Sequence, residues 1–394
     1  MSTLQATSVH DSSRPEATGP GSAGTVRRRV LLAPITVTPS KPLTPSHLKG
    51  LLWTDVMYRA TGRLADVTYR YSPTTYHLTE QTLGFWEYLD RTVGDADYSG
   101  LSEERIGEMY VGHRAEGRRV GAAALRPYAE AVEHHGWVHP ASVRVLELWA
   151  AHYRQLGMHD PGLLAHQPPG LGLEEVIDRL GALAMCLDQR VYGGPVFLDA
   201  TRYGLPLRQL VDAQGQPNYL ACALRELVPL APRFDEIVLL YDRELESDYL
   251  LLERVLSAFG ATVRRVTLGR VPIDGQIRSA RHGDWHDHTA AALLGKAAAE
   301  YEEEVLRLGM RLYFIAVLGP GQQQSFDHDV LRHSLTRAAR LLSGGRDTDP
   351  APLPDVMARH RGDHLYVNPY RLTSSLLAKH RPAPTPDLLT AVYL

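Results

Sequence analysis

The chain has 394 residues, of which 44% are hydrophobic and 22% are charged, and this length suits one large domain or two of ordinary size. A formal net charge of -3 gives no overall basic field that would attract nucleic acid. Two cysteines, Cys186 and Cys222, are too few for a disulfide framework or a four-cysteine zinc site. No run of about 18 apolar residues and no signal-peptide core is present, so the sequence predicts a cytoplasmic protein without a membrane partner.

The N-terminal part alternates strand and helix patterns. Residues 1–26 are rich in Ser, Thr, Gly and Pro and predict a disordered tail. An apolar strand near 29–37 precedes a helix from Pro45 to about Ala60, with Thr44 as the N-cap. A second strand and a second helix follow in "ADVTYRY" and "TEQTLGFWEYLDRT". Strand, helix and strand in this order favour a parallel sheet, hence an α/β fold.

The pattern of the remaining sequence predicts a helical insertion followed by further strands of the sheet. Residues 100–190 are mostly helical in pattern and look like an insertion between sheet strands. Residues 208–224 predict β structure around a turn at Gln214-Gly215. The elements expected after that turn are a buried strand in 234–242, a helix over 247–260, a strand over 261–271, a polar loop, and one long helix over 289–309.

Several short segments occur in an informative order. "KPLTPSHLKGLLWTDVMYRATG" resembles the signature segment of class I aminoacyl-tRNA synthetases, most closely the arginyl enzymes, and keeps Lys41, Pro42, Leu43, His47 and Leu48. The further matches are Gln81 before an apolar helix, "LW" at Leu148-Trp149, "RYGLPLRQLVDAQGQPNYLACAL", the loop "GQIRSARHG", and "RLYFIAVLGPGQQQSFDHDVLRHSL". The resemblance covers roughly residues 28–345. It implies a Rossmann-like catalytic domain over 27–290 and a helical C-terminal subdomain over 291–394, without the family's appended tRNA-binding domains.

The sequence departs from the family pattern at positions that belong to the family's ATP and substrate sites. Thr44 stands where the family has the first signature histidine, and Ser46 where it has glycine. Ala223 falls where the arginyl enzymes have the aspartate that holds the substrate guanidinium, whereas Tyr219 matches. Free L-arginine is therefore an unexpected substrate by this route, because a buried guanidinium needs a carboxylate partner. Four acidic residues remain as alternative carboxylates: Glu226, Glu244, Glu246 and Asp248.

The resemblance implies ATP and Mg²⁺ as cofactors and assigns residues to them. A helix N-terminus offers N–H donors and the positive end of its dipole to phosphates. The expected catalytic residues are Lys41, His47, Ser279 and Arg281, and Lys49 is expected to add positive charge. The expected ATP-binding residues are Thr44, Ser46, His47, Arg278, Arg281 and His282, and those for the carboxylate substrate are Thr38, Ser40, Tyr76, Gln81, Tyr219 and Ala223. The His- and Asp-rich stretch 282–288 reads as a polar loop, and we expect no metal site built from protein residues.

Three functions remain open at this point. The first is an ATP-dependent ligase that activates an amino acid or similar carboxylate as an adenylate and passes it to a small acceptor in specialised biosynthesis. The second is a non-catalytic synthetase-like binding protein. The third is a transferase that uses charged tRNA without ATP; tRNA as a partner is not favoured because the net charge is mildly negative.

Overall fold

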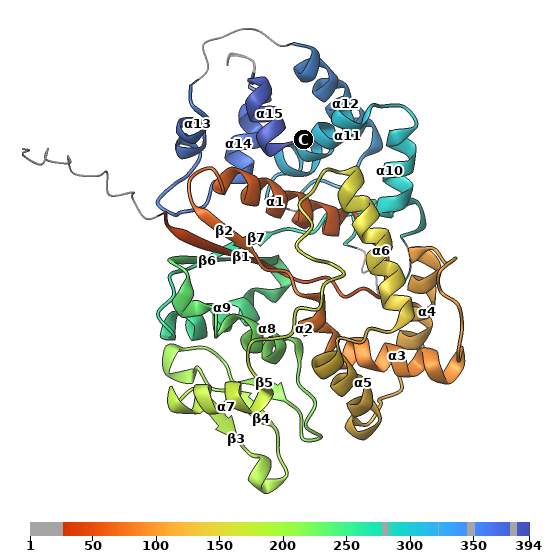
Figure 1. The fold of residues 1–394 in the computed structure, drawn as a ribbon, viewed down its shortest axis with the longest axis vertical. Helices are drawn as coiled ribbons and strands as arrows, with labels where there is room; N and C mark the ends of the chain where they lie inside the picture. Colours follow the sequence, from red (N-terminus) through yellow and green to blue (C-terminus); the bar gives the residue numbers. More distant parts are fainter. Residues whose placement is uncertain (1–26, 278–282, 284, 322, 345–350, 379–383) are drawn as a thin grey trace, which may run out of the picture.

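The computed structural model describes residues 27–277, 283, 285–321, 323–344, 351–378 and 384–394, so the expected tail over 1–26 lies outside the described residues. The described chain is a mixed α/β structure around a four-stranded parallel sheet (Figure 1). The strands of this sheet are β1 (Arg29–Pro34), β2 (Asp66–Tyr69), β6 (Glu236–Asp242) and β7 (Val263–Leu268), in the order β2-β1-β6-β7. A separate three-stranded antiparallel sheet contains β3 (Cys186–Asp188), β4 (Val196–Leu198) and β5 (Arg208–Val211).

The two central strands are apolar on both faces, as expected for buried parallel strands. Val30 and Leu32 of β1 belong to one hydrophobic cluster, which also contains Met57 of the first helix. Leu31 and Ala33 point the other way and belong to a second cluster. The alternation means that β1 needs a helical layer on each side of the sheet.

Helices provide these two layers. Figure 1 shows α1 (Pro45–Thr61) on one side of the sheet and α8 (Tyr219–Leu227) and α9 (Glu246–Ala258) on the other. Between β2 and the small sheet lie α2 (Pro73–His77), α3 (Glu80–Thr92), α4 (Glu103–Glu116), α5 (Ala122–His135), α6 (Pro140–Gln155) and α7 (Leu173–Ala182). After β7 come α10 (Ala290–Ala298), α11 (Glu303–Arg311), a π-helical turn (Leu312–Val317), α12 (His328–Ser343), α13 (Leu353–Arg359), α14 (Pro369–Ser375) and α15 (Pro386–Val392).

A buried ion pair fixes helix α1 against the C-terminal helices. The Arg311 guanidinium of α11 donates to Asp55 Oδ2 of α1 at 2.6 Å, and both side chains are at most 1% exposed. Asp55 Oδ1 also accepts from Arg59 Nε at 3.2 Å and from the His159 backbone N–H at 2.9 Å. The contacts of Asp55, in the middle of α1, therefore fix this helix along the sheet, with its N-terminus at the edge of the sheet.

Two expected elements differ in the structure. Residues 219–227 form α8 rather than β structure, because Asn218 caps a helix by accepting the Ala221 N–H at 2.9 Å. The single long helix expected over 289–309 is broken into α10 and α11. The break suits Glu303 and Glu304, whose charges are favourable in the first turn of a new helix.

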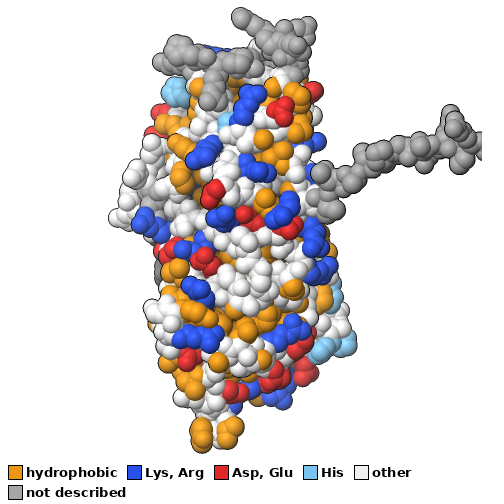
Figure 2. Space-filling view, turned by 90° about the vertical axis from the view of Figure 1, so that its left-hand side faces the viewer, with side chains coloured by type: hydrophobic (Ala, Val, Ile, Leu, Met, Phe, Trp, Pro, Cys, Tyr) orange, Lys and Arg blue, Asp and Glu red, His pale blue; other side chains and the backbone are white. Residues whose placement is uncertain are grey.

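The described residues form no long apolar helix, and charge is not segregated on the face shown in Figure 2. Within the described ranges, no helix combines the length and hydropathy needed to cross a bilayer. Figure 2 shows Lys and Arg side chains mixed with Asp and Glu on one face of the molecule.

Candidate functional site

The candidate site lies at the carboxyl ends of β1 and β6. The chain leaves β1 toward β2 on one side and leaves β6 toward β7 on the other, and α1 and α9 cover opposite faces. Such a reversal opens a crevice beyond the strand ends, where open α/β sheets bind ligands. A cavity of about 580 Å³ occupies this crevice, lined by the segment after β1, the start of α1 and the ends of β6 and β7.

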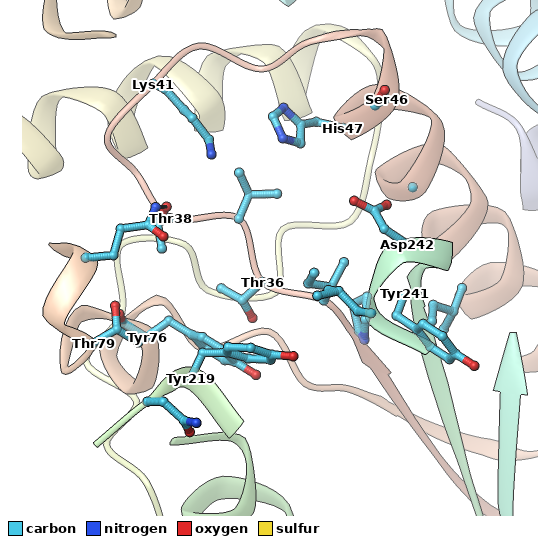
Figure 3. Close-up of a pocket in the computed structure, with 18 of the residues that line it drawn as sticks. Thr36, Thr38, Lys41, Ser46, His47, Tyr76, Thr79, Tyr219, Tyr241 and Asp242 are labelled. Carbon is cyan, nitrogen blue, oxygen red and sulfur yellow. Dashed lines mark hydrogen bonds between the residues drawn. The ribbon is translucent and has the colours of Figure 1, made fainter. Parts of the chain in front are cut away.

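The cavity has two chemically different walls (Figure 3). Lys41, His47 and Ser46 lie along one wall, whereas Tyr76, Thr79 and Tyr219 lie along the opposite one, with Thr36 and Thr38 between them. Thr44 and Gln81 also line the cavity. Two residues expected to bind substrate do not line it: Ser40 and Ala223 are both buried elsewhere, at 0% and 3% exposure.

The start of α1 fixes which ring nitrogen of neutral His47 carries the proton. Thr44 is the N-cap as expected, and its backbone N–H donates to His47 Nδ1 at 3.0 Å, three residues into the helix. The Thr44 hydroxyl lies 3.2 Å from the same nitrogen. Because Nδ1 accepts, the proton of the neutral ring is on Nε2. This is a capping box with histidine in the place of the usual glutamate or glutamine, and it leaves the ring one N–H to donate.

Electrostatics keeps this ring neutral. Burial lowers the pKa of His47 to about 3, and the positive charges of Lys41 and Arg270 act in the same direction. His47 therefore offers a neutral hydrogen-bond donor at physiological pH, and the positive charge near it comes from Lys41 and Arg270. The Lys41 Nζ also lies 5.9 Å from the centre of the Tyr110 ring.

Two other polar residues of the signature segment join α1 to neighbouring loops. Lys49 is 1% exposed and outside the cavity wall, and its Nζ donates to the carbonyls of Gly269 at 2.9 Å and Gly321 at 2.6 Å. Burial lowers the pKa of Lys49 to about 8. Lys49 thus positions loops and does not face the cavity. The Ser46 hydroxyl lines the cavity but also accepts from the Val271 N–H at 3.0 Å.

Sequence reasoning missed the charged residues of the cavity at the ends of β6 and β7. Asp242 ends β6 and Arg270 follows β7, and Arg270 Nε lies 3.1 Å from Asp242 Oδ2. Burial raises the pKa of Asp242, and Arg270 opposes this effect. Both residues occupy the carboxyl ends of strands that the apolar pattern predicts. That position in a parallel sheet is the signal that would have identified them.

Each of the four alternative carboxylates is paired with an arginine of the chain itself. Glu226 Oε1 lies 2.5 Å from Arg70 Nε, and burial raises the pKa of this nearly buried carboxyl. The other pairs are Glu244 with Arg270, Glu246 with Arg265, and Asp248 with Arg208. All four carboxylates therefore already have an arginine partner, although Arg270 is shared between Glu244 and Asp242.

The expected loop residues Arg278, Ser279, Arg281 and His282 lie outside the described residues.

The described residues that line the cavity fit a phosphate, since Lys41, Arg270, His47 and a helix N-terminus converge there. No group of three or more His, Cys, Asp or Glu side chains in the described part of the chain is arranged to hold a metal. Mg²⁺ in nucleotide sites is usually held through phosphates and one or two carboxylates, and Asp242 is a carboxylate of this wall.

Comparison with solved structures identifies the type of fold. No protein-family model and no curated protein matches the sequence. The structure is similar to that of the arginyl-tRNA synthetase of Thermus thermophilus, with a TM-score of 0.58 and 16% identity over 95% of this chain and 77% of that one. It is also similar to the arginyl-tRNA synthetase of Plasmodium falciparum, with a TM-score of 0.52 and 11% identity over 86% of this chain and 63% of that one. The chain therefore has an aminoacyl-tRNA-synthetase-like fold.

Proposed function

We propose that the chain is an adenylate-forming ligase of the class I aminoacyl-tRNA synthetase type, with a Rossmann-like catalytic domain. It would bind ATP and Mg²⁺, activate an amino acid or similar carboxylic acid as an adenylate, and transfer the acyl group to a small acceptor with release of AMP. The observation that carries the proposal is the neutral His47 ring beside Lys41, at a helix N-terminus, in a cavity that has a second, hydroxyl-rich wall.

ATP, when bound, supplies the α-phosphate that a carboxylate attacks with loss of pyrophosphate. His47 would donate its Nε2–H to a phosphate oxygen, and Lys41 would balance the negative charge that grows there. His47 would act as a neutral donor, because burial lowers its pKa to about 3. Neutral groups would orient the acid: Gln81 Nε2 donates to Thr38 Oγ1 at 3.1 Å, and both residues line the cavity.

A small acceptor is favoured over tRNA for an electrostatic reason. Proteins that bind nucleic acid neutralise several phosphates with a continuous basic surface. This chain has a net charge of -3, and acidic side chains interrupt the basic ones on the face shown in Figure 2. Transfer to an amine or hydroxyl of a small molecule needs no such surface.

Amino-acid-dependent exchange of labelled pyrophosphate into ATP tests the activity. A panel of amino acids and other carboxylic acids, with the full chain and Mg²⁺, should include at least one that supports exchange. A non-catalytic binding protein would bind an ATP analogue in the cavity but give no exchange with any acid. A transferase using charged tRNA would consume aminoacyl-tRNA without ATP, which a release assay with labelled aminoacyl-tRNA detects.

A further inference from the structure

The buried carboxylate beside the hydroxyl-rich wall is fully engaged by the chain. Asp248, in the first turn of α9, is 5% exposed. The Arg208 guanidinium of β5 contacts both of its oxygens, with Nε 2.8 Å from Oδ1 and an NH₂ group donating to Oδ2 at 3.0 Å. The Tyr219 hydroxyl also donates to Asp248 Oδ2. The carboxylate thus has a bidentate arginine partner and a third donor, and cannot act as counter-ion for a ligand.

This network determines what Tyr219 presents to the cavity. Tyr219 lines the cavity, but its O–H group donates its hydrogen bond to Asp248. Burial and this contact raise the pKa of Tyr219, so the hydroxyl stays protonated. The oxygen is left with lone pairs, which accept a hydrogen bond from a ligand N–H or O–H group.

The other carboxylates near this wall do not change the conclusion. Glu226, the second buried one, is paired with Arg70. Asp212 lines the cavity, and its Oδ1 accepts the backbone N–H groups of Gln214 and Gln216 in its own turn. Glu80, in the first turn of α3, also lines the cavity, but it is exposed, so water screens its charge.

We infer that Arg208 is a specificity-determining residue: by occupying Asp248 it makes this end of the cavity select an acid whose far end is uncharged and carries a hydrogen-bond donor. Cationic amino acids are disfavoured at this end, because Asp248, the buried carboxylate beside this wall, is already paired with Arg208. The inference rests on the proposed function for the identity of the ligand as a carboxylic acid, but the binding preference is independent of ATP chemistry.

Calorimetric binding of L-arginine and L-citrulline tests the inference, since the two have nearly the same shape and only arginine carries a side-chain charge. The natural chain should bind L-arginine at least about tenfold more weakly than L-citrulline, or not at all. Arg208→Met frees Asp248 and should strengthen L-arginine binding by about 10- to 100-fold without a matching gain for L-citrulline. Arg208→Lys retains a charge and should keep the natural preference.

Controls separate this effect from altered folding. Arg179→Met removes an exposed arginine that pairs with Glu175 on α7 and does not line the cavity, and it should leave both affinities unchanged. Adding Asp248→Asn to Arg208→Met should abolish the gain for L-arginine. The inference is overturned if the natural chain binds L-arginine as well as L-citrulline, or if folded Arg208→Met gains no affinity for L-arginine. Because no ATP is present, these results stand whether or not pyrophosphate exchange is found.

Discussion

Thr44 and His47 form a reciprocal cap in which the backbone N–H of Thr44 donates to His47 Nδ1 at 3.0 Å. The same contact has a structural and a chemical consequence. It satisfies a polar group at the start of α1, and it forces the ring proton onto Nε2. Since Pro45 at the first helical position has no N–H, the His47 ring is a principal donor from this helix start to the cavity.

We predict that His47→Ala lowers pyrophosphate exchange by about 100- to 1000-fold, the effect of removing one donor to transition-state charge. The substitution also removes the cap and should cost about 1 kcal/mol of stability. Exchange rates and urea unfolding measure the two effects separately.

His47→Glu provides the matched control, because Thr-x-x-Glu is the usual form of the capping box. It should unfold close to the natural chain yet lose exchange at least as strongly, since a carboxylate has no N–H to donate. A folded His47→Ala protein with normal turnover would show that the phosphates bind elsewhere. If both variants lose activity only in proportion to unfolding, the ring serves α1 alone.

The two lysines of the signature segment should behave in opposite ways. Lys49→Met leaves the carbonyls of Gly269 and Gly321 without their donor and should lower the free energy of unfolding by about 1–3 kcal/mol. Lys41→Met removes one positive charge from the cavity wall and should raise the KM for ATP by about tenfold with little change in stability. Exchange kinetics and urea unfolding of both variants check this; a large KM effect from Lys49→Met at full stability would reverse the assignment.

The elements around the cavity were predictable because their signals are local. Thr44 before Pro45 predicts the start of α1, and the apolar run of β6 predicts a buried parallel strand, as found. Asn218 carried a cap signal for α8, which the turn at Gln214-Gly215 obscured. The Arg70–Glu226 pair could not be foreseen, since its members are 156 positions apart and only the packing of the sheet brings them together.

The ion pair between α1 and α11 gives a stability prediction. Arg311→Met leaves Asp55 as a buried charge that has lost its main partner, and should lower the free energy of unfolding by about 3–5 kcal/mol. Asp55→Asn combined with Arg311→Met removes the uncompensated charge and should recover part of the loss. A urea-unfolding double-mutant cycle measures the coupling. Additive losses would mean that Arg59, the other cation at Asp55, carries the interaction instead.

The last prediction concerns acid stability and His77, at the end of α2. This side chain is 1% exposed, and neither ring nitrogen has a hydrogen-bond partner among the described residues. Burial lowers its pKa from 6.5 to about 3. Between these values the unfolded chain binds a proton that the folded chain does not, so stability rises with pH there. The contribution is complete above pH 6.5 and is lost as the pH falls toward 3.

His77→Leu removes this titration and leaves no unpaired polar atoms at the site. It should keep or raise stability at neutral pH, because no hydrogen bond to another described residue is lost. Below pH 6.5 it should flatten the acid loss by up to about 1.4 kcal/mol per pH unit. Urea unfolding of both proteins at about pH 7 and about pH 5 gives the difference. Equal acid losses in the two would mean that His77 is protonated in the folded chain, and a marked loss at neutral pH would reveal a hydrogen bond to the ring.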